Sequence, residues 1–166
     1  MKVLWPLGLM ILLSVPSISW GAEANYNDAK YCSRHFAMHG DVSLPADAQR
    51  KCVIAIASTY VNGEENTAPM EDMLLADDIS RHRLGTPADH QAGAADRIKS
   101  GGPSVILAIK NRHWTADGNQ AWIAYDGYLK GKPDAPSFYV AERFTIESGL
   151  IKEILLAPVV MVEQDQ

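Results

Sequence analysis

Apolar and polar residues alternate along this chain with two different periods. From residue 45 to residue 63 the apolar side chains recur at helical spacing, between a start at Ser43 and Pro45 and a stop at Asn62-Gly63. Apolar residues occupy both sides of this segment: one stripe is Ala48, Cys52, Ala55, Ile56, Thr59 and Tyr60, and the other is Val53, Ile54, Ala57 and Val61. We therefore expect a long helix that is covered on two sides and lies across a sheet.

Strand periodicity begins at Ser104 and continues to the end of the chain. The β-rich runs are 105–114, 120–129, 137–146 and 150–162. Short glycine-containing connections, such as Asp117-Gly118 and Ser148-Gly149, predict hairpins, so these runs form an antiparallel meander. The predicted order is helices, one short strand, one helix and then a four-stranded sheet, which indicates an α+β fold.

The segment between the long helix and the meander predicts three short elements. Residues 69–74 can form a short helix, and a brief strand is expected at 79–84. Thr86-Pro87-Ala88-Asp89 has the form of a capping box with proline at the first helical position. We expect the helix that starts there to end at Lys99, just before two glycines.

The N-terminus has the pattern of a secretory signal peptide. Lys2 precedes an apolar run that ends near Val15, and cleavage is expected after Gly21 or after Ala24. The run is short for a membrane span, and an uncleaved anchor is the alternative interpretation. We therefore expect a periplasmic or secreted protein that is free of the membrane after cleavage.

The length predicts a signal peptide over 1–21, an N-terminal segment over 25–44 and one domain over 45–166. The formal net charge of −5, without a basic cluster, argues against nucleic acid and against an anionic membrane as partner. A small molecule or another protein is the expected partner.

Cys32 and Cys52 are the two cysteines of the chain. In a secreted protein this pair predicts a disulfide that ties the N-terminal segment to the long helix. The alternative is a metal site with Cys32, His35 and His39 on one helix face, but a fourth ligand is not evident. We predict no metal and no cofactor.

Several short stretches resemble the nuclear-transport-factor-2-like (NTF2-like) superfamily, which includes SnoaL-like polyketide cyclases and ketosteroid isomerases. They are "YVNG" at the end of the long helix, "LADDI" leading into the first strand, and the closing hairpin "FYVAERFTIESGLIKEILLAPV". Within the superfamily, "SRHRLG" and the "AE-x-F-x-I" strand look most like a poorly characterised group. The resemblance covers roughly residues 45 to 162.

The resemblance implies a cone: a strongly curved antiparallel sheet wrapped around the long N-terminal helix and open at one end. In relatives the cone holds an apolar ligand, polar residues deep inside act on it, and many members are homodimers through the outer sheet face. Where ketosteroid isomerases carry an aspartate base after the "ADD" passage, this chain has Arg81, His82 and Arg83. The sequence therefore departs from the isomerase pattern at its best-defined catalytic position.

Glu142 is the first candidate for chemistry, because strand alternation puts it on one face with Val140, Phe144 and Ile146. A carboxyl group on a buried face has a raised pKa and can act as an acid or base near neutral pH. The alternatives are an ion pair with Arg81, Arg83 or Arg143 inside the protein, or a solvated edge position.

His82 is the second candidate catalytic residue. On a strand it points away from both Arg81 and Arg83, so either the histidine or the arginine pair faces the pocket. An inward histidine suits general base catalysis, and inward arginines suit anchoring of a carboxylate or enolate oxygen. A solvated surface histidine is the third alternative.

Three aromatic residues are candidate ligand contacts. Tyr125 lies on the more apolar face of its strand and is expected in the pocket wall, with Tyr60 on the long helix as a further hydroxyl donor. Trp114, next to His113, is expected at the pocket entrance. The leading hypothesis is a domain that binds a small apolar molecule, with or without isomerase, cyclase or dehydratase chemistry. The alternative is a non-catalytic interaction or dimerisation module.

Overall fold

A computed structural model describes residues 24–101, 104–132, 134–157 and 160–161. The predicted signal peptide lies outside these residues. In the part of the chain that is described, no helix is long and apolar enough to cross a membrane.

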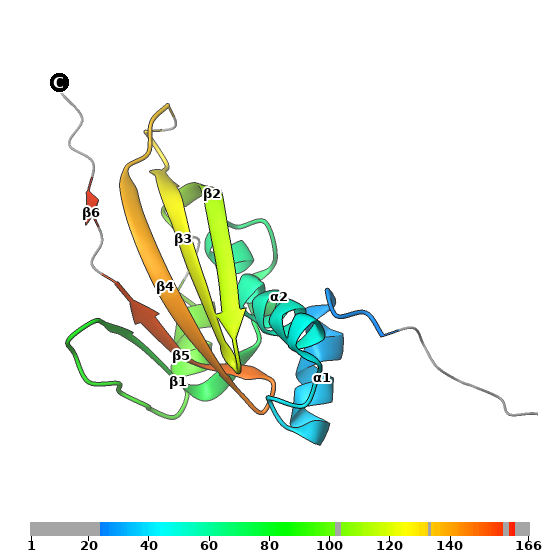
Figure 1. The fold of residues 1–166 in the computed structure, drawn as a ribbon. Helices are drawn as coiled ribbons and strands as arrows, with labels where there is room; N and C mark the ends of the chain where they lie inside the picture. Colours follow the sequence, from blue (N-terminus) through cyan, green and yellow to red (C-terminus); the bar gives the residue numbers. More distant parts are fainter. Residues whose placement is uncertain (1–23, 102–103, 133, 158–159, 162–166) are drawn as a thin grey trace, which may run out of the picture.

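One mixed sheet forms the centre of the fold (Figure 1). Its strands are β1 (Leu75–Arg83), β2 (Ile106–Asp117), β3 (Gln120–Leu129), β4 (Phe138–Glu147), β5 (Leu150–Leu156) and β6 (Val160–Met161). Their order is β1-β5-β4-β3-β2, with β6 paired to β4. Strands β2 to β5 are joined in antiparallel pairs, which confirms the predicted meander, and β1 pairs in parallel with β5.

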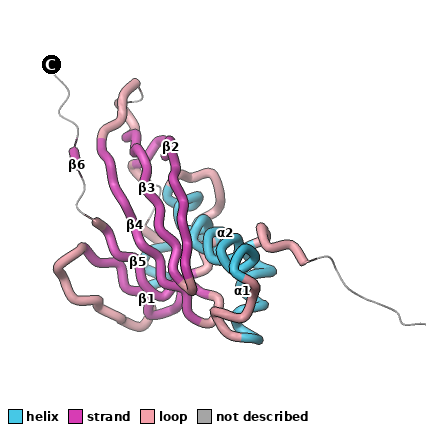
Figure 2. The backbone as a smooth tube through the Cα atoms, in the orientation of Figure 1, coloured by secondary structure: helices cyan, strands magenta, loops and turns pink. Residues whose placement is uncertain are grey.

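The long helix was predicted almost to its ends. Helix α2 (Ala46–Glu64) lies against β2, β3, β4 and β5, and helix α1 (Ala29–His39) packs on another side of it. Figure 2 shows α1 and α2 on the same side of the sheet. Because α2 is covered twice, both of its apolar stripes contribute buried residues, among them Val53 and Ile56.

The N-terminal segment is fastened to the domain at two places. Cys32 and Cys52 form the predicted disulfide between α1 and α2. After α1, the carboxylate of Asp41 accepts hydrogen bonds from the amides of Ser148 and Gly149, at 2.8 and 2.9 Å. These amides belong to the turn between β4 and β5, so α1 and its following loop hold the hairpin that carries Glu142.

The helix predicted from Thr86 is wrong in its first half. Helix α3 covers only Ala94–Lys99, and the residues before it form a loop against the edge strand β1. The amide of Asp89 donates to Ser80 Oγ, and the amide of Gly93 donates to Asp77 Oδ1. These bonds to β1 take the place of the expected capping box. The brief strand predicted at 79–84 is longer and begins at Leu75, and the predicted 69–74 helix is a 3-10 turn, η1 (Met70–Asp72).

The shape of the sheet also differs from the expectation. The sheet is an open layer with a free edge at β1 and another at β2, and it is not strongly curled into a cone. The fold is α+β, with a sheet on one side and helices on the other. The hollow described below is therefore formed between the sheet, the end of α2 and the α3 region rather than inside a closed barrel.

Candidate functional site

Glu142 lies in the buried layer between the sheet and α2. Val140, Phe144 and Ile146 share its face of β4 and are buried, as the alternation predicts, and the residue Glu142 itself is only 3% exposed. Its backbone position is fixed by pairing on both sides, with Ile123 on β3 and Leu156 on β5. Backbone pairing therefore fixes the position of Glu142, and the two residues directly opposite it on β3 and β5 are apolar.

The Glu142 carboxyl group is almost unpartnered. Its Oε1 accepts a long hydrogen bond of 3.4 Å from the Tyr125 hydroxyl, and its buried Oε2 has no hydrogen-bond partner among the residues that the structure describes. Within the described residues no ion pair joins it to an arginine, because Arg143 on the opposite face pairs with Glu153 at 2.6 Å. The predicted alternative of an internal ion pair is not the arrangement found in the structure.

Burial raises the pKa of Glu142 from 4.5 to about 7. The positive charge of Arg81 opposes this shift, the nearby Glu64 adds to it, and the hydrogen bond from Tyr125 opposes it. Burial, followed by the proximity of Glu142, also raises the pKa of the Tyr125 hydroxyl above its ordinary range. Tyr125 therefore remains a neutral donor, while Glu142 can be protonated or ionised near neutral pH.

Arg81, and not His82, points toward this group. The Arg81 guanidinium carbon lies 6.0 Å from the centre of the Tyr60 ring, a cation–π distance. Tyr60 is buried on α2, and burial holds the pKa of its hydroxyl well above the usual value. Its hydroxyl oxygen has no hydrogen-bond partner in the described part of the chain. Arg81 thus brings a cation from the edge strand β1 over the Tyr60 ring and close enough to act on the pKa of Glu142.

His82 occupies the other face of β1. Its Nδ1 lies 2.9 Å from the carbonyl oxygen of Thr86, and its Nε2 lies 3.2 Å from Glu153 Oε1. Glu153 also accepts from Arg143. Burial would raise the pKa of Glu153, but the bonds from His82 and Arg143 outweigh it and hold that pKa below its ordinary value. Both residues predicted as catalytic, Glu142 and His82, line the cavity described below, but the His82 ring nitrogens lie against Thr86 and Glu153 rather than against Glu142.

A cavity of about 620 Å³ opens above Glu142. Its volume lies within the range of about 300–1,000 Å³ that is usual for small-molecule sites. Polar groups at its surface come from Glu64, Arg81, His82, Arg83, Ser104, Tyr125 and Glu142, and apolar groups come from Met70, Ile98, Val105, Ile106, Leu129, Phe138, Val140, Leu156 and Met161. Glycine at position 127 lets the Phe138 ring lie flat against the strand, since a Cβ there would overlap the ring.

Arg83 and Trp114 were predicted as ligand contacts, and Glu64 was not predicted as a site residue. Arg83 lines the cavity, whereas Trp114 does not; its ring packs 6.1 Å from that of Phe144 in the core. Glu64 was not predicted, although it lies one helical turn after Tyr60 on α2 and so on the same face. The i, i+4 spacing was the available signal.

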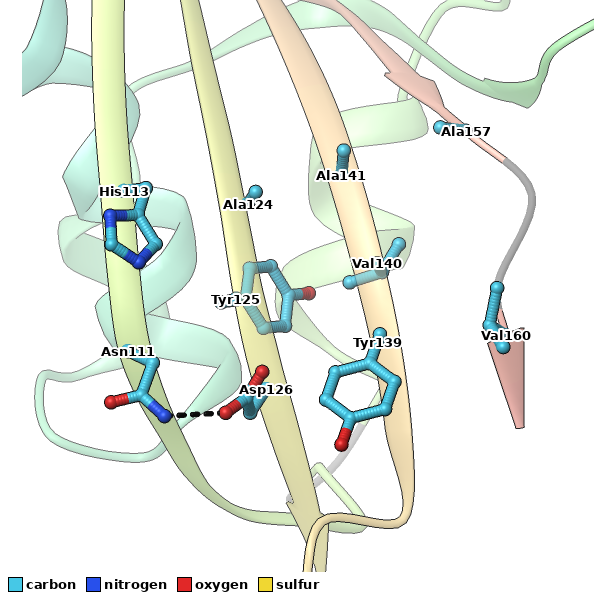
Figure 3. A pocket seen from close by; sticks show the side chains of 10 residues that line it. All are labelled: Asn111, His113, Ala124, Tyr125, Asp126, Tyr139, Val140, Ala141, Ala157 and Val160. Carbon is cyan, nitrogen blue, oxygen red and sulfur yellow. Dashed lines mark hydrogen bonds between the residues drawn. The ribbon is translucent and has the colours of Figure 1, made fainter. Parts of the chain in front are cut away.

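A second, shallower hollow of about 510 Å³ lies on the opposite face of the sheet (Figure 3). Ala124 and Ala141 form its floor, and His113, Asp126 and Tyr139 stand around it. Asn111 Nδ2 donates to Asp126 Oδ2 at 2.5 Å. Asn111 has a φ of 52° at an irregular point of β2, where the register with β3 shifts.

The sequence matches a family model described as a domain of unknown function (DUF8021) over residues 46–156. No curated protein matches the chain significantly. A "putative ketosteroid isomerase" from Kribbella flavida is similar in structure, with 18% identity, a TM-score of 0.50, and coverage of 69% of this chain and 82% of that one.

Two further solved structures are similar to a lesser degree. An NTF2-like protein of unknown function from Cytophaga hutchinsonii has 11% identity, a TM-score of 0.45 and coverage of 63% and 87% of the two chains. An LEH-like epoxide hydrolase from M. tuberculosis has 17% identity, a TM-score of 0.48 and coverage of 63% and 80%. The likeness to the Kribbella flavida structure agrees with the fold that the sequence resemblance implied. At these identities the likeness shows the fold and leaves the activity open.

Proposed function

The chain belongs to the family described as a domain of unknown function (DUF8021), and because this description names no activity, we propose a function from the cavity itself. The protein binds a small, largely apolar molecule above Glu142, and Glu142 exchanges a proton with that molecule. The observation that carries the proposal is the unpartnered, buried Oε2 of Glu142 at the surface of a cavity of about 620 Å³. Buried polar groups are normally satisfied, so this oxygen is available to a ligand.

The chemistry that suits this arrangement is acid–base catalysis of the isomerase, cyclase or dehydratase type. A pKa of about 7 leaves Glu142 able to remove a proton in its ionised form and to return it in its protonated form. Tyr125 can donate a hydrogen bond, and Arg81 can stabilise negative charge that develops on a ligand oxygen. His82 has no part in this proposal, because its ring is engaged by Thr86 and Glu153.

The experiment that tests this proposal is native mass spectrometry of protein purified from its own host. We expect a retained small molecule in the wild type and a reduced amount in Glu142→Gln. Glu147→Gln is the matched control, because Glu147 is an exposed carboxylate on the same strand. Repeated preparations without any bound molecule, or equal retention in both variants, would contradict the proposal.

We further propose that the protein works outside the cytoplasm. The Cys32–Cys52 disulfide and the signal-like pattern of the first residues support this location. Mass measurement of the protein recovered from a periplasmic or culture fraction should show a chain that starts after residue 21 or after residue 24. Recovery of the full-length chain in a reduced form would contradict it.

The second candidate function is interaction with a protein, in the simplest case a second copy of this chain. The hollow on the outer face, next to the exposed Tyr139 and Val160, is the observation that favours it. Ala124→Arg would place a charge on that face and leave the cavity unchanged. If the wild type is a dimer and Ala124→Arg halves its mass in sedimentation equilibrium while the ligand is still retained, the outer face is an interface. That result would also separate the interaction function from the binding function.

A further inference from the structure

The polarity of the cavity changes with depth. The most buried lining residues include Glu142, at 3% exposure, and Tyr125, at 7%. At the opposite extreme, Val105 is 70% exposed and Met161 is 62% exposed, so they lie at the rim. The walls between them are apolar, with Ile106, Leu129, Phe138 and Leu156 among the lining residues. A ligand that matches this gradient has a polar group at one end and an apolar body that extends toward the rim.

The charges around Glu142 indicate the sign of that polar group. The groups that face Glu142 are Tyr60 and Glu64 from α2, Arg81 from β1 and Tyr125 from β3. Arg83 adds a second guanidinium to the cavity lining, and His82 between the two arginines also lines it. Arg81 and Arg83 are exposed residues of β1, so their charges enter the cavity from its solvent side. When Glu142 is protonated, the guanidinium groups of Arg81 and Arg83 line the cavity together with one remaining carboxyl group, that of Glu64. The cavity then favours an anionic ligand over a cationic one.

The small excess of positive charge in the cavity lining favours an anion with a single negative charge. Within the described residues Arg81 forms no ion pair with Glu142, and its guanidinium stands over the Tyr60 ring, where it can also face a ligand. A carboxylate is a suitable partner, since a guanidinium group can bind both of its oxygens. A neutral ketone would use Tyr125 and Glu142 but would leave the charge of Arg81 unmatched. A doubly charged phosphate carries more negative charge than the net charge of +1 that Arg81, Arg83 and Glu64 leave in the lining when Glu142 is protonated.

We propose that the ligand is a monocarboxylic acid with an apolar tail, bound carboxylate first, with Arg81 as its counter-charge and protonated Glu142 as its hydrogen-bond donor. This inference rests on the proposed binding function and specifies its ligand class. The two carboxyl groups share one proton, carried by Glu142, and no covalent bond forms or breaks. Above pH 7, where Glu142 is ionised, binding must take up one proton from the solvent.

Titration calorimetry with octanoate tests the inference, with octan-1-ol and octanamide as uncharged ligands of the same chain length. We expect octanoate to bind at least about tenfold more tightly than either uncharged ligand, because the charge-assisted bonds are present only with the acid. Between pH 7.5 and 8.5 its affinity should fall about tenfold per pH unit. Measurements in two buffers of different ionisation enthalpy should show uptake of close to one proton.

Two variants and one control test which residues cause the preference for octanoate and the proton uptake. Arg81→Met should abolish the preference for octanoate over octan-1-ol, while Arg34→Met, at an exposed position on α1, should preserve it. Glu142→Gln should weaken octanoate binding, because an amide is a weaker hydrogen-bond donor than a carboxylic acid, and should lose the proton uptake. Equal affinity for octanoate and octan-1-ol would overturn the ligand class and leave the binding function standing. Octanoate binding that neither variant alters, or no octanoate binding while a host-derived molecule is retained, would overturn the inference as well.

Discussion

Glu142 and Glu153 are carboxylates on neighbouring strands of one sheet, yet their environments are opposite. Glu142 on β4 faces the cavity, among apolar side chains, and no cation pairs with it directly. Glu153 on β5 faces away from α2 and accepts from both His82 and Arg143. Burial raises the pKa of Glu142 to about 7, whereas its two partners hold the pKa of Glu153 below the ordinary value.

The difference teaches how to separate a structural carboxylate from a candidate reactive one. A partnered carboxylate stabilises the fold and is kept in one protonation state. An unpartnered carboxylate in a cavity costs stability, and such perturbed groups gather at functional sites. Four substitutions sharpen or break this comparison, and they are described from the largest expected effect to the smallest.

Glu142→Gln should stabilise the protein most at alkaline pH. Below about pH 4.5 the carboxyl group is protonated in both the folded and the unfolded chain. Between pH 4.5 and pH 7 the unfolded chain loses this proton first, so the wild type should lose about 3 kcal/mol of unfolding free energy that the variant retains. Urea unfolding from pH 4 to pH 8 measures the difference, and Glu147→Gln is the control. Parallel stability curves for variant and wild type would contradict the raised pKa.

Glu153→Gln should lower the free energy of unfolding, whereas Glu142→Gln should raise it. Removing the charge weakens the bonds from Arg143 and His82 and should cost about 2 kcal/mol at pH 7. Since the pKa of Glu153 is lowered in the folded chain, this stability is present above pH 4.5 and is lost as the pH falls further. The cost should therefore shrink in unfolding experiments at pH 3. A variant that is as stable as the wild type at pH 7 would break the comparison.

Arg81→Met should make the environment of Glu142 still less favourable for charge. The Arg81 cation opposes the effect of burial, so its loss should move the pKa of Glu142 further upward and cost about 1 kcal/mol at pH 8. The carboxyl carbon signal of Glu142 in an NMR titration reports the shift directly. The signal of Glu153 should titrate as before, and movement of both signals would point to a general rearrangement.

Tyr125→Phe should produce the smallest change. It removes the 3.4 Å hydrogen bond to Glu142 and keeps the ring that packs edge-on against Phe138. Because the bond is long, we expect a stability loss of about 0.5 kcal/mol and a slight upward movement of the pKa of Glu142. The same NMR titration checks this. A downward movement would show that the hydroxyl does not donate to the carboxylate.

Short-range periodicity predicted the parts of the site that depend on a single strand or helix. Alternation placed Glu142 and Tyr125 on buried faces, and the glycine-containing turns predicted the meander that brings them together. For β1, alternation showed that Arg81 and His82 point in opposite directions. It did not show which of them approaches Tyr60 and Glu142, because that depends on the parallel pairing with β5, which no local pattern encodes.

Tertiary contacts determine the features that the local sequence patterns did not predict. The residues after Thr86 have a helix-start pattern, but bonds from the amides of Asp89 and Gly93 to the edge strand keep them in a loop. The sheet is flatter than the resemblance implied, since the degree of bending depends on the register of whole strands. Glu64 escaped prediction because its approach to Glu142 depends on where the end of α2 meets the sheet.

The hydrogen bonds between Asp41 and the β4–β5 turn limit how far the N-terminus can be truncated for expression. The family match begins at residue 46, downstream of Cys32 and of Asp41. A fragment trimmed to residues 46–156 would carry Cys52 as a free thiol on an uncovered apolar helix, and the amides of Ser148 and Gly149 would lose their acceptor. We therefore expect the smallest unit that folds independently to be larger than the stretch matched by the family model, and expression should begin upstream of α1.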